Sequence, residues 1–347
     1  QAEDGIRDRS PSRGLGDVYK RQIQDPVSGT HFWVLAGLLV GLTAEESRVV
    51  SLDRKGLRVA FMIVGIGLAA LSMNSGARIL IADSYFLEGK RWFNKGKGLE
   101  AVHAMRQASE WRDADFRHHH MLGFFAAVVA NAAGTDSQIG RRMYVEAESA
   151  LRRTLQLHPN NAPALRSFGK MLLMTHREGE AVEYLRRTVH LDPLVADNYD
   201  LLADAYRNTG DHSRALEARK QALSFRPHDS DLMMELATEY RLSGDLEASV
   251  AVLERAATVS PLDGIVQGSL GSVYLALGRP VDAEQPLKVA IGSDSSIVAW
   301  RHNLVRSLMQ QRRLEEVVEE LREALGLFPQ DAVLQSLARE MISDKNE

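Results

Sequence analysis

The stretch Pro227–Pro261, PHDSDLMMELATEYRLSGDLEASVAVLERAATVSP, decides the fold because its two prolines bound one copy of a repeating unit. Prolines at positions 159, 193, 227 and 261 are each 34 residues apart, and the next one in register, at 329, lies two such steps further on. A fixed period of this length is typical of stacked helical hairpins. The register predicts seven hairpin units, which begin at Ala82, Phe116, Ala162, Ala196, Ser230, Gly264 and Val298.

Small residues recur inside each unit where two helices must approach closely. The eighth position is Gly or Ala in six of the seven units and Val305 in the last. The fifteenth position holds Gly96, Gly210, Gly244 or Gly278, and glycine tolerates the left-handed conformation that follows a helix end. After the proline comes Asp or Asn, as in PHDSDL and PNNAPAL, and these side chains can cap the next helix. Each turn is therefore specified locally.

This pattern resembles the tetratricopeptide repeat family over residues 82–331. The resemblance implies an all-α fold: a right-handed superhelical solenoid of about seven helical hairpins, with residues 332–347 as a capping helix and tail. Asp113 and Ser295 replace the repeated proline, so we expect looser junctions there. The second unit keeps register only with an insertion, which we expect as a loop at about residues 131–142. A neutral surface excursion and a partner contact are both open for that loop.

The first 22 residues differ in origin from the rest of the chain. Residues 1–8 and 12–22 read as the in-frame translation of two sequencing-adapter oligonucleotides, and residues 9–11 read as the sample index between them. We therefore interpret residues 1–22 as a translated adapter artefact and exclude them from fold reasoning. We expect the natural chain, a metagenomic fragment whose gene was cut upstream, to start near Ile23.

The composition is that of an ordinary globular protein, with 45% hydrophobic and 25% charged residues. The formal net charge of −4 gives no basic excess, so no nucleic-acid partner is expected. The chain has no cysteine, which excludes disulfides, thiolate metal sites and cysteine nucleophiles. No phosphate-binding glycine loop, HExxH pair or GxSxG elbow occurs in the repeats. We predict no catalytic residue, cofactor or metal site in this fragment.

Residues 23–81 form a predicted membrane segment with two apolar stretches. Val59–Ala77 is 19 residues without a charge, about the length that spans a bilayer as a helix. His31–Ala44 is shorter and needs Val27–Thr30 to cross, and a buried core helix is the alternative for both stretches. We therefore expect one or two transmembrane helices before the repeats, with the bilayer contacting residues 31–44 and 59–77.

Basic residues between the two stretches predict the orientation. The connecting sequence SRVVSLDRKGLR carries four Arg or Lys residues, whereas residues 23–30 carry none. The positive-inside bias places the connection in the cytoplasm. The expected location is the bacterial inner membrane with the repeats on the periplasmic side.

Three groups of residues attract attention without indicating chemistry. His118, His119 and His120 are consecutive, so on a helix their side chains diverge by about 100° and cannot converge on one ion; we expect a solvated or partly packed helix start. The cluster Glu315, Glu316, Glu319 and Glu320 is interpreted as a solvated face, with a basic partner as the alternative. Met171 is predicted to lie in the core.

The resemblance also implies a concave face lined by positions 2, 5, 9, 12 and 13 of each first helix. Ten side chains at these positions are the candidate groove residues for a bound protein or extended peptide: Arg166, Lys170, Asp200, Asp204, Arg207, Asn208, Thr238, Arg241, His302 and Arg306. Because their charge is mixed, a peptide of alternating charge is the expected ligand. Solvated surface is the alternative for each residue.

Two apolar stretches that lead directly into repeats resemble the C-terminal end of bacterial O-antigen ligase and polymerase family membrane proteins. The resemblance rests on this arrangement and on DPVSGTHFWVLAGLLVGL, residues 25–42. It implies a membrane-anchored interaction scaffold within a glycan-assembly protein whose catalytic residues lie upstream. The alternatives are a non-enzymatic membrane-tethered adaptor for envelope or cytochrome c assembly, and a soluble scaffold with apolar terminal helices.

Overall fold

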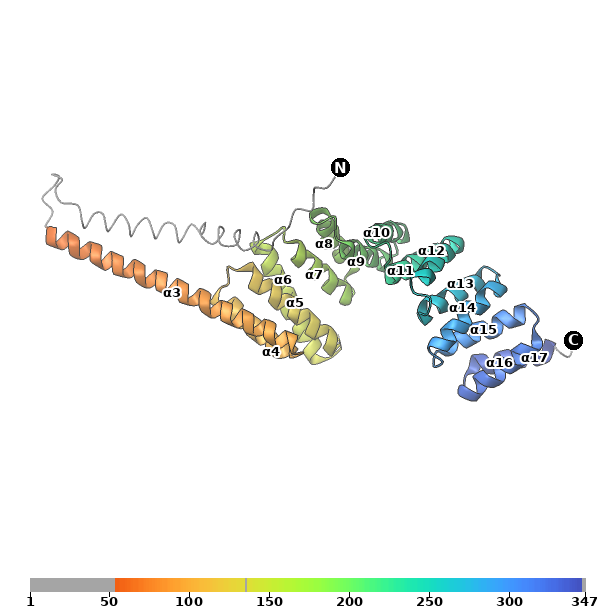
Figure 1. Ribbon diagram of the computed structural model, residues 1–347. Helices are drawn as coiled ribbons and strands as arrows, with labels where there is room; N and C mark the ends of the chain where they lie inside the picture. The colour runs from red at the N-terminus through yellow and green to blue at the C-terminus, as the bar shows by residue number, and fades with distance from the viewer. Residues whose placement is uncertain (1–53, 135, 345–347) are drawn as a thin grey trace, which may run out of the picture. The chain divides into compact units, whose positions relative to one another are not determined.

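The computed structural model describes residues 54–134 and 136–344 and divides the chain into two units, residues 1–113 and 114–347 (Figure 1). All regular secondary structure in the described ranges is helical, which confirms the all-α prediction. The expectations for the adapter-like residues 1–22 and for the apolar stretch 31–44 lie outside the described residues. The division at residue 113 falls at a junction that lacks the repeated proline.

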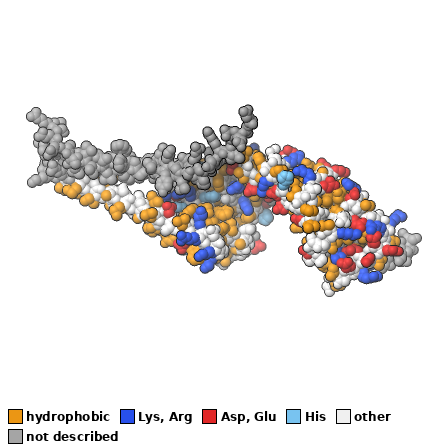
Figure 2. Space-filling view, viewed as in Figure 1, with side chains coloured by type: hydrophobic (Ala, Val, Ile, Leu, Met, Phe, Trp, Pro, Cys, Tyr) orange, Lys and Arg blue, Asp and Glu red, His pale blue; other side chains and the backbone are white. Residues whose placement is uncertain are grey.

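The described part of the first unit is one long helix and its partner. Helix α3 (Arg54–Asn94) turns at Gly96, whose φ is +74°, and packs against α4 (Gly98–Trp111). The first predicted hairpin is therefore present, but its first helix is continuous with the apolar stretch before it. The side chains of that stretch are exposed, as Figure 2 shows along α3.

The second unit is a series of helical hairpins in chain order. Each first helix packs against the second helix that follows it, and each second helix packs against the next first helix. The hairpins are α5 (Phe116–Ala133) with α6 (Gln138–Leu157), α7 (Ala162–Met174) with α8 (Glu178–Leu191), α9 (Ala196–Asn208) with α10 (His212–Phe225), α11 (Ser230–Leu242) with α12 (Leu246–Val259), α13 (Gly264–Ala276) with α14 (Pro280–Ser293), and α15 (Val298–Gln310) with α16 (Leu314–Leu327), followed by α17 (Ala332–Asp344). All six first helices begin at the residue that the 34-residue register predicts.

Glycine at the eighth position allows the helices of a hairpin to cross closely. A Cβ atom on Gly169 would lie 2.6 Å from Cγ of Leu185, and Gly123 and Gly271 are equally close to Leu151 and Leu287. These leucines occupy the twenty-fourth position of their units and are fully buried. The crossing is therefore built from a glycine on one helix and a leucine on the other.

Four of the predicted caps are formed, whereas α9, which follows Pro193, has Val195 at its N-cap and no side-chain cap. The side chains of Asn161, Asp229, Asp263 and Asp331 each accept a hydrogen bond from a backbone N–H in the first turn of the next helix. Such caps satisfy backbone donors that the helix itself leaves without partners. Ser295 marks the second junction that lacks the repeated proline, after the one at Asp113. Five residues after Ser295, the ring of Trp300 lies against Gly268 of α13.

The insertion in the second unit lengthens both of its helices. Helix α5 ends at Ala133 and α6 begins at Gln138, so the loop expected over residues 131–142 is shorter in the structure. Gly140 falls within the expected loop, but it lies in the first turn of α6. A Cβ atom there would meet the carbonyl oxygen of Gly134 at 1.9 Å, so the glycine permits a tight entry into the helix.

The remaining sequence expectations concern the core and the histidines. Met171 is buried, as predicted. His118 and His119 are also buried rather than solvated, whereas His120 is half-buried with Nε2 3.3 Å from Oγ of Ser167. In the described ranges no group of three or more His, Cys, Asp or Glu residues is placed to hold a metal ion.

Candidate functional site

The first helices of unit 2 form one face, here called the first-helix face. Within it, α7 contacts α5 and α9, α13 contacts α11 and α15, and α15 also contacts α17. Three grooves open on this face, lined mainly by residues of α5–α7–α9, of α11–α13–α15 and of α15–α17. We call the first the upstream groove and the second the downstream groove.

The upstream groove has an apolar floor and charged walls. Val128 of α5, Met174 of α7 and Leu201 of α9 line it, and its volume is about 580 Å³. Arg166 and Lys170 stand on the α7 side, and Asp197 and Asp200 stand on the α9 side. The space is large enough for one or two side chains of a bound segment but is open to solvent, which suits a surface recognition site better than an enclosed catalytic pocket.

The downstream groove is smaller and more polar, with a volume of about 420 Å³. Thr238, Arg241 and Ser272 line it together with Asn303, whose amide donates to Oγ of Ser272 at 2.9 Å. Ile265 at its edge is 60% exposed. The groove therefore offers hydrogen-bonding groups beside one apolar side chain.

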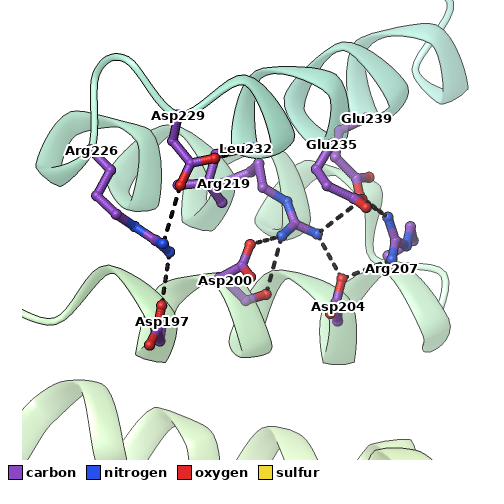
Figure 3. Close-up of polar contacts among 10 residues, drawn as sticks. All are labelled: Asp197, Asp200, Asp204, Arg207, Arg219, Arg226, Asp229, Leu232, Glu235 and Glu239. Carbon is purple, nitrogen blue, oxygen red and sulfur yellow. Dashed lines mark hydrogen bonds and ion pairs between the residues drawn. The ribbon is translucent and has the colours of Figure 1, made fainter. Parts of the chain in front are cut away.

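Between the grooves lies a cluster of ion pairs centred on Arg219 of α10 (Figure 3). The side chain of Arg219 is 1% exposed, yet its guanidinium reaches the first-helix face and donates to Asp200 and to Asp204, the latter at 2.6 Å. Arg207 donates to Asp204 and to Glu235, each at 2.7 Å. The carboxylates of α9 and α11 are thus held by two guanidinium groups.

Burial and charge compete within this cluster. Burial raises the pKa of the fully buried Glu239 carboxyl more than the nearby Arg207 and Arg219 lower it. Burial likewise raises the pKa of Asp200, although Arg219 opposes the shift. Oε2 of Glu239 and Nε of Arg219 are buried without a hydrogen-bond partner among the described residues. The cluster is therefore tightly packed but not fully satisfied.

The ten candidate groove residues fall into six environments. Arg166, Lys170 and Asp200 line the upstream groove, Thr238 and Arg241 line the downstream groove, and Arg306 lines the groove of α15–α17. Asp204 and Arg207 belong to the ion-pair cluster together with Asp200. His302 is held with Nε2 2.8 Å from Oδ1 of Asp331, the cap of α17, and Asn208 is exposed at the end of α9. The structure therefore brings most of the ten residues to one face. Both acidic candidates, Asp200 and Asp204, are held in ion pairs there.

Sequence reasoning missed Arg219 and Glu239. Arg219 occupies the twenty-fourth position of its unit, where every other unit has Leu or Met. Glu239 occupies the tenth position of its unit, where its neighbours have Ala205 and Val273. A charged residue at a position that is otherwise apolar was the signal that could have identified both.

The acidic residues of α16 are also partly engaged. Arg301 of α15 is 4% exposed and donates to Glu320 and Glu323, each at 2.7 Å. Arg313 pairs with Glu316. The interpretation of this cluster as a solvated face is therefore correct for the exposed Glu315 and Glu319 but wrong for Glu320, which neutralises a buried guanidinium.

Comparison with known proteins supports the repeats. Sequence profiles described as tetratricopeptide repeat match residues 196–229 and 234–297, so these segments are tetratricopeptide repeats, as predicted. A comparison with curated proteins gives no match.

Solved structures share the fold at low sequence identity. A tetratricopeptide repeat protein from Parabacteroides merdae has a TM-score of 0.51 and 13% identity over 76% of this chain and 99% of its own. YrrB, described as a TPR protein with an unusual peptide-binding site, has a TM-score of 0.49 and 16% identity over 55% of this chain and 98% of its own. MamA has a TM-score of 0.43 and 22% identity over 45% and 91%. We draw from the first of these only the fold, because the other two align more loosely.

Proposed function

We propose that unit 2 is a protein-binding scaffold whose first-helix face holds an extended segment of another protein. The observation that carries this proposal is the position of the grooves: three of them open on the same face, and they lie along successive first helices. Stacked repeats present an extended surface of this kind without enclosing a dry pocket for chemistry.

Selection of peptides from a random displayed library against the full chain in lipid nanodiscs tests this proposal. We expect groove-binding peptides to slow backbone hydrogen exchange in α7, α9, α11 and α13. The second helices α8, α10, α12 and α14 serve as internal reference. Failure to select any peptide, or protection confined to the second helices, would remove the first-helix face as the binding surface.

We also propose that the first half of α3 crosses a membrane. From Val59 the helix contains an 18-residue window with a mean hydropathy of 1.7, and none of that window is buried in the described part of the chain. Ile63 and Ile66 are 65% and 66% exposed, whereas the core helix of a globular unit would bury such residues. Water is a poor solvent for this surface, and a bilayer would cover it.

Charge insertion tests the membrane proposal. Replacing Ile63 and Ile66 by Lys disfavours insertion by about 2.5–3.5 kcal/mol for each lysine near a helix centre. We expect this variant to leave the membrane pellet after alkaline carbonate extraction. The matched control replaces Leu194 and Leu262, which are 77% and 80% exposed in unit 2, and it should stay in the pellet. Release of both variants and of the unaltered chain into the supernatant would favour a soluble scaffold. Retention of both variants in the pellet would show that the first half of α3 is not needed for membrane association.

The periplasmic position of the repeats is a proposal that rests on the basic residues before Val59. Because the chain has no cysteine, one cysteine introduced at exposed Gln221 gives a single labelling site. We expect a membrane-impermeant maleimide to label it in spheroplasts before lysis. Labelling only after lysis would place the repeats in the cytoplasm.

We further propose that the scaffold serves a glycan-assembly protein of the O-antigen ligase and polymerase type. The support is the sequence resemblance of residues 25–42 and the order of apolar stretches and repeats. The gene recovered from an independent assembly tests it: many further membrane spans upstream favour the ligase-like protein, and their absence favours the membrane-tethered adaptor.

A further inference from the structure

The acidic side chains of the first-helix face are largely held in ion pairs within the chain. Arg219 and Arg207 hold Asp200, Asp204 and Glu235. Arg226, from the end of α10, donates to Asp197 at 2.8 Å. Of these three arginines only Arg207 is one of the ten candidate groove residues. The ion pairs that Arg219 and Arg226 make with the acidic candidates and their neighbours are therefore visible only in the folded chain.

Apart from Arg207, four basic side chains of the same face have no ion pair with a described residue. Arg166 and Lys170 of α7, Arg241 of α11 and Arg306 of α15 form no ion pair with any described residue. The acidic groove-position residues left without an ion pair in the described part of unit 2 are Asp231 and Glu340. Among the groove-position side chains without an ion pair, cations therefore outnumber carboxylates by four to two, although the whole chain has a formal net charge of −4.

Two of these cations flank the apolar part of the upstream groove. Arg166 and Lys170 are four residues apart on α7, which places them on the same side of the helix. They border the upstream groove, whose floor includes Val128, Met174 and Leu201. A segment bound there would place apolar side chains on the floor and meet cationic groups at the rim.

We propose that the partner is an acidic segment of another protein in which carboxylates alternate with apolar side chains. Its apolar side chains enter the upstream groove, its carboxylates face Arg166 and Lys170, and its continuation passes the downstream groove near Arg241. This proposal rests on the proposed scaffold function and replaces the sequence-based expectation of a ligand with alternating charge. A nucleic acid is disfavoured because the chain is acidic overall, with a formal net charge of −4.

The composition of the peptides selected from the random displayed library tests this inference. We expect Asp and Glu to be enriched and Lys and Arg to be depleted relative to the input library. Binding of a selected peptide should weaken as NaCl rises from 50 to 500 mM, because salt screens exposed charges. The double variant Arg166→Glu and Lys170→Glu should bind the same peptide at least about tenfold more weakly, since rim attraction becomes repulsion.

A matched control carries the same change of charge on the second helices. Arg186 of α8 and Arg255 of α12 are exposed, and the double variant Arg186→Glu and Arg255→Glu should bind as the unaltered chain does. Circular dichroism of all variants shows whether the helices are retained.

The outcomes separate this inference from the scaffold proposal. Selected peptides that are neutral or basic, yet protect the first-helix face, would overturn the acidic partner and leave the scaffold intact. Equal weakening by the α7 variant and the control variant would overturn the upstream groove as the docking site. Selection of no peptide would overturn the scaffold itself.

Discussion

The hairpins α7–α8 and α9–α10 have the same length and register but are closed by different chemistry. In α7–α8, Gly169 leaves room for Leu185, which is fully buried. In α9–α10, the equivalent positions hold Ala203 and Arg219, and the guanidinium of Arg219 emerges toward Asp200 and Asp204. One hairpin is closed by apolar contact and the next by ion pairs.

This difference shows how a repeat can carry a local function without changing its backbone. Burying a charge is tolerated only when partners surround it, and the two aspartates of α9 provide them. Their side chains remain 31% and 32% exposed, so they keep part of their hydration while they neutralise Arg219. As a result the acidic charges of α9 are used internally, and the cations of neighbouring α7 are left for a partner.

Removal of the buried guanidinium should have the largest effect on stability. Arg219→Ala leaves a cavity, removes the cation of Asp200 and leaves Asp204 with Arg207 alone, and we expect the free energy of unfolding to fall by about 2–4 kcal/mol. Denaturant unfolding measures it. Gln221→Ala, an exposed change on the same helix, should stay within about 0.5 kcal/mol of the unaltered chain. If both variants unfold alike, the ion pairs do not close the hairpin.

Filling the glycine crossing of α7–α8 should have the next largest effect. Gly169→Leu places carbon atoms where the Leu185 side chain lies, so we expect a loss of about 1–3 kcal/mol from overpacking. Gly326→Leu is the matched control, because a Cβ atom at this helical glycine meets nothing within 4 Å. A thermal unfolding curve for Gly169→Leu that coincides with that of Gly326→Leu would contradict the close crossing.

The register, the caps and the crossings could be predicted because each depends on residue type at a fixed spacing. A 34-residue period sets where helices begin, and Asp or Asn after the proline can act only locally. The glycines of the eighth position predicted the contact with the following helix, and Gly169 makes it. The insertion was harder because Gly140 is a helix residue that permits close backbone contact rather than a loop residue.

The charge of the candidate site could not be predicted in the same way. Sequence placed Asp200 and Arg166 on one face, but whether each keeps a free charge depends on long side chains that arrive from other helices. Arg219 crosses from α10, and Arg226 reaches Asp197 from the loop after it. A flexible arginine can turn toward solvent or toward the core, and the spacing of residues does not decide between the two.

The two hairpins should also differ in their response to pH. Burial raises the pKa of Glu239 beside α9–α10 above its ordinary value, with Arg207, Arg219, Glu235 and His212 facing it. A raised folded-state pKa gives stability that is present at low pH and lost as pH rises through that pKa. Relative to the unaltered chain, Glu239→Gln should therefore gain stability as pH rises from about 4 to 7, because glutamine cannot ionise.

Glu148 supplies the opposite case beside α7–α8. Although burial alone would raise its pKa, hydrogen bonds from Arg152 and Arg177 bring that pKa below its ordinary value. Its stabilising contribution is present at neutral pH and lost as pH falls through the folded-state pKa, so Glu148→Gln should lose stability relative to the unaltered chain as pH rises. Melting temperatures of both variants at pH 4 and 7 measure the two slopes, and slopes of the same sign would contradict the assigned directions.

The smallest expected effect concerns the turns within the two hairpins. His176 in α7–α8 has φ of +55°, whereas α9–α10 uses Gly210, at +82°, for the equivalent residue. A residue with a side chain is about 1–2 kcal/mol less stable than glycine in the left-handed region. Replacing it by glycine relieves this strain, but the greater conformational entropy of glycine in the unfolded chain offsets part of the stabilisation. We therefore expect His176→Gly to stabilise the protein by about 0.5 kcal/mol. The reciprocal change, Gly210→Ala, should destabilise it, and denaturant midpoints that move in one direction for both variants would show that the turns do not differ in strain.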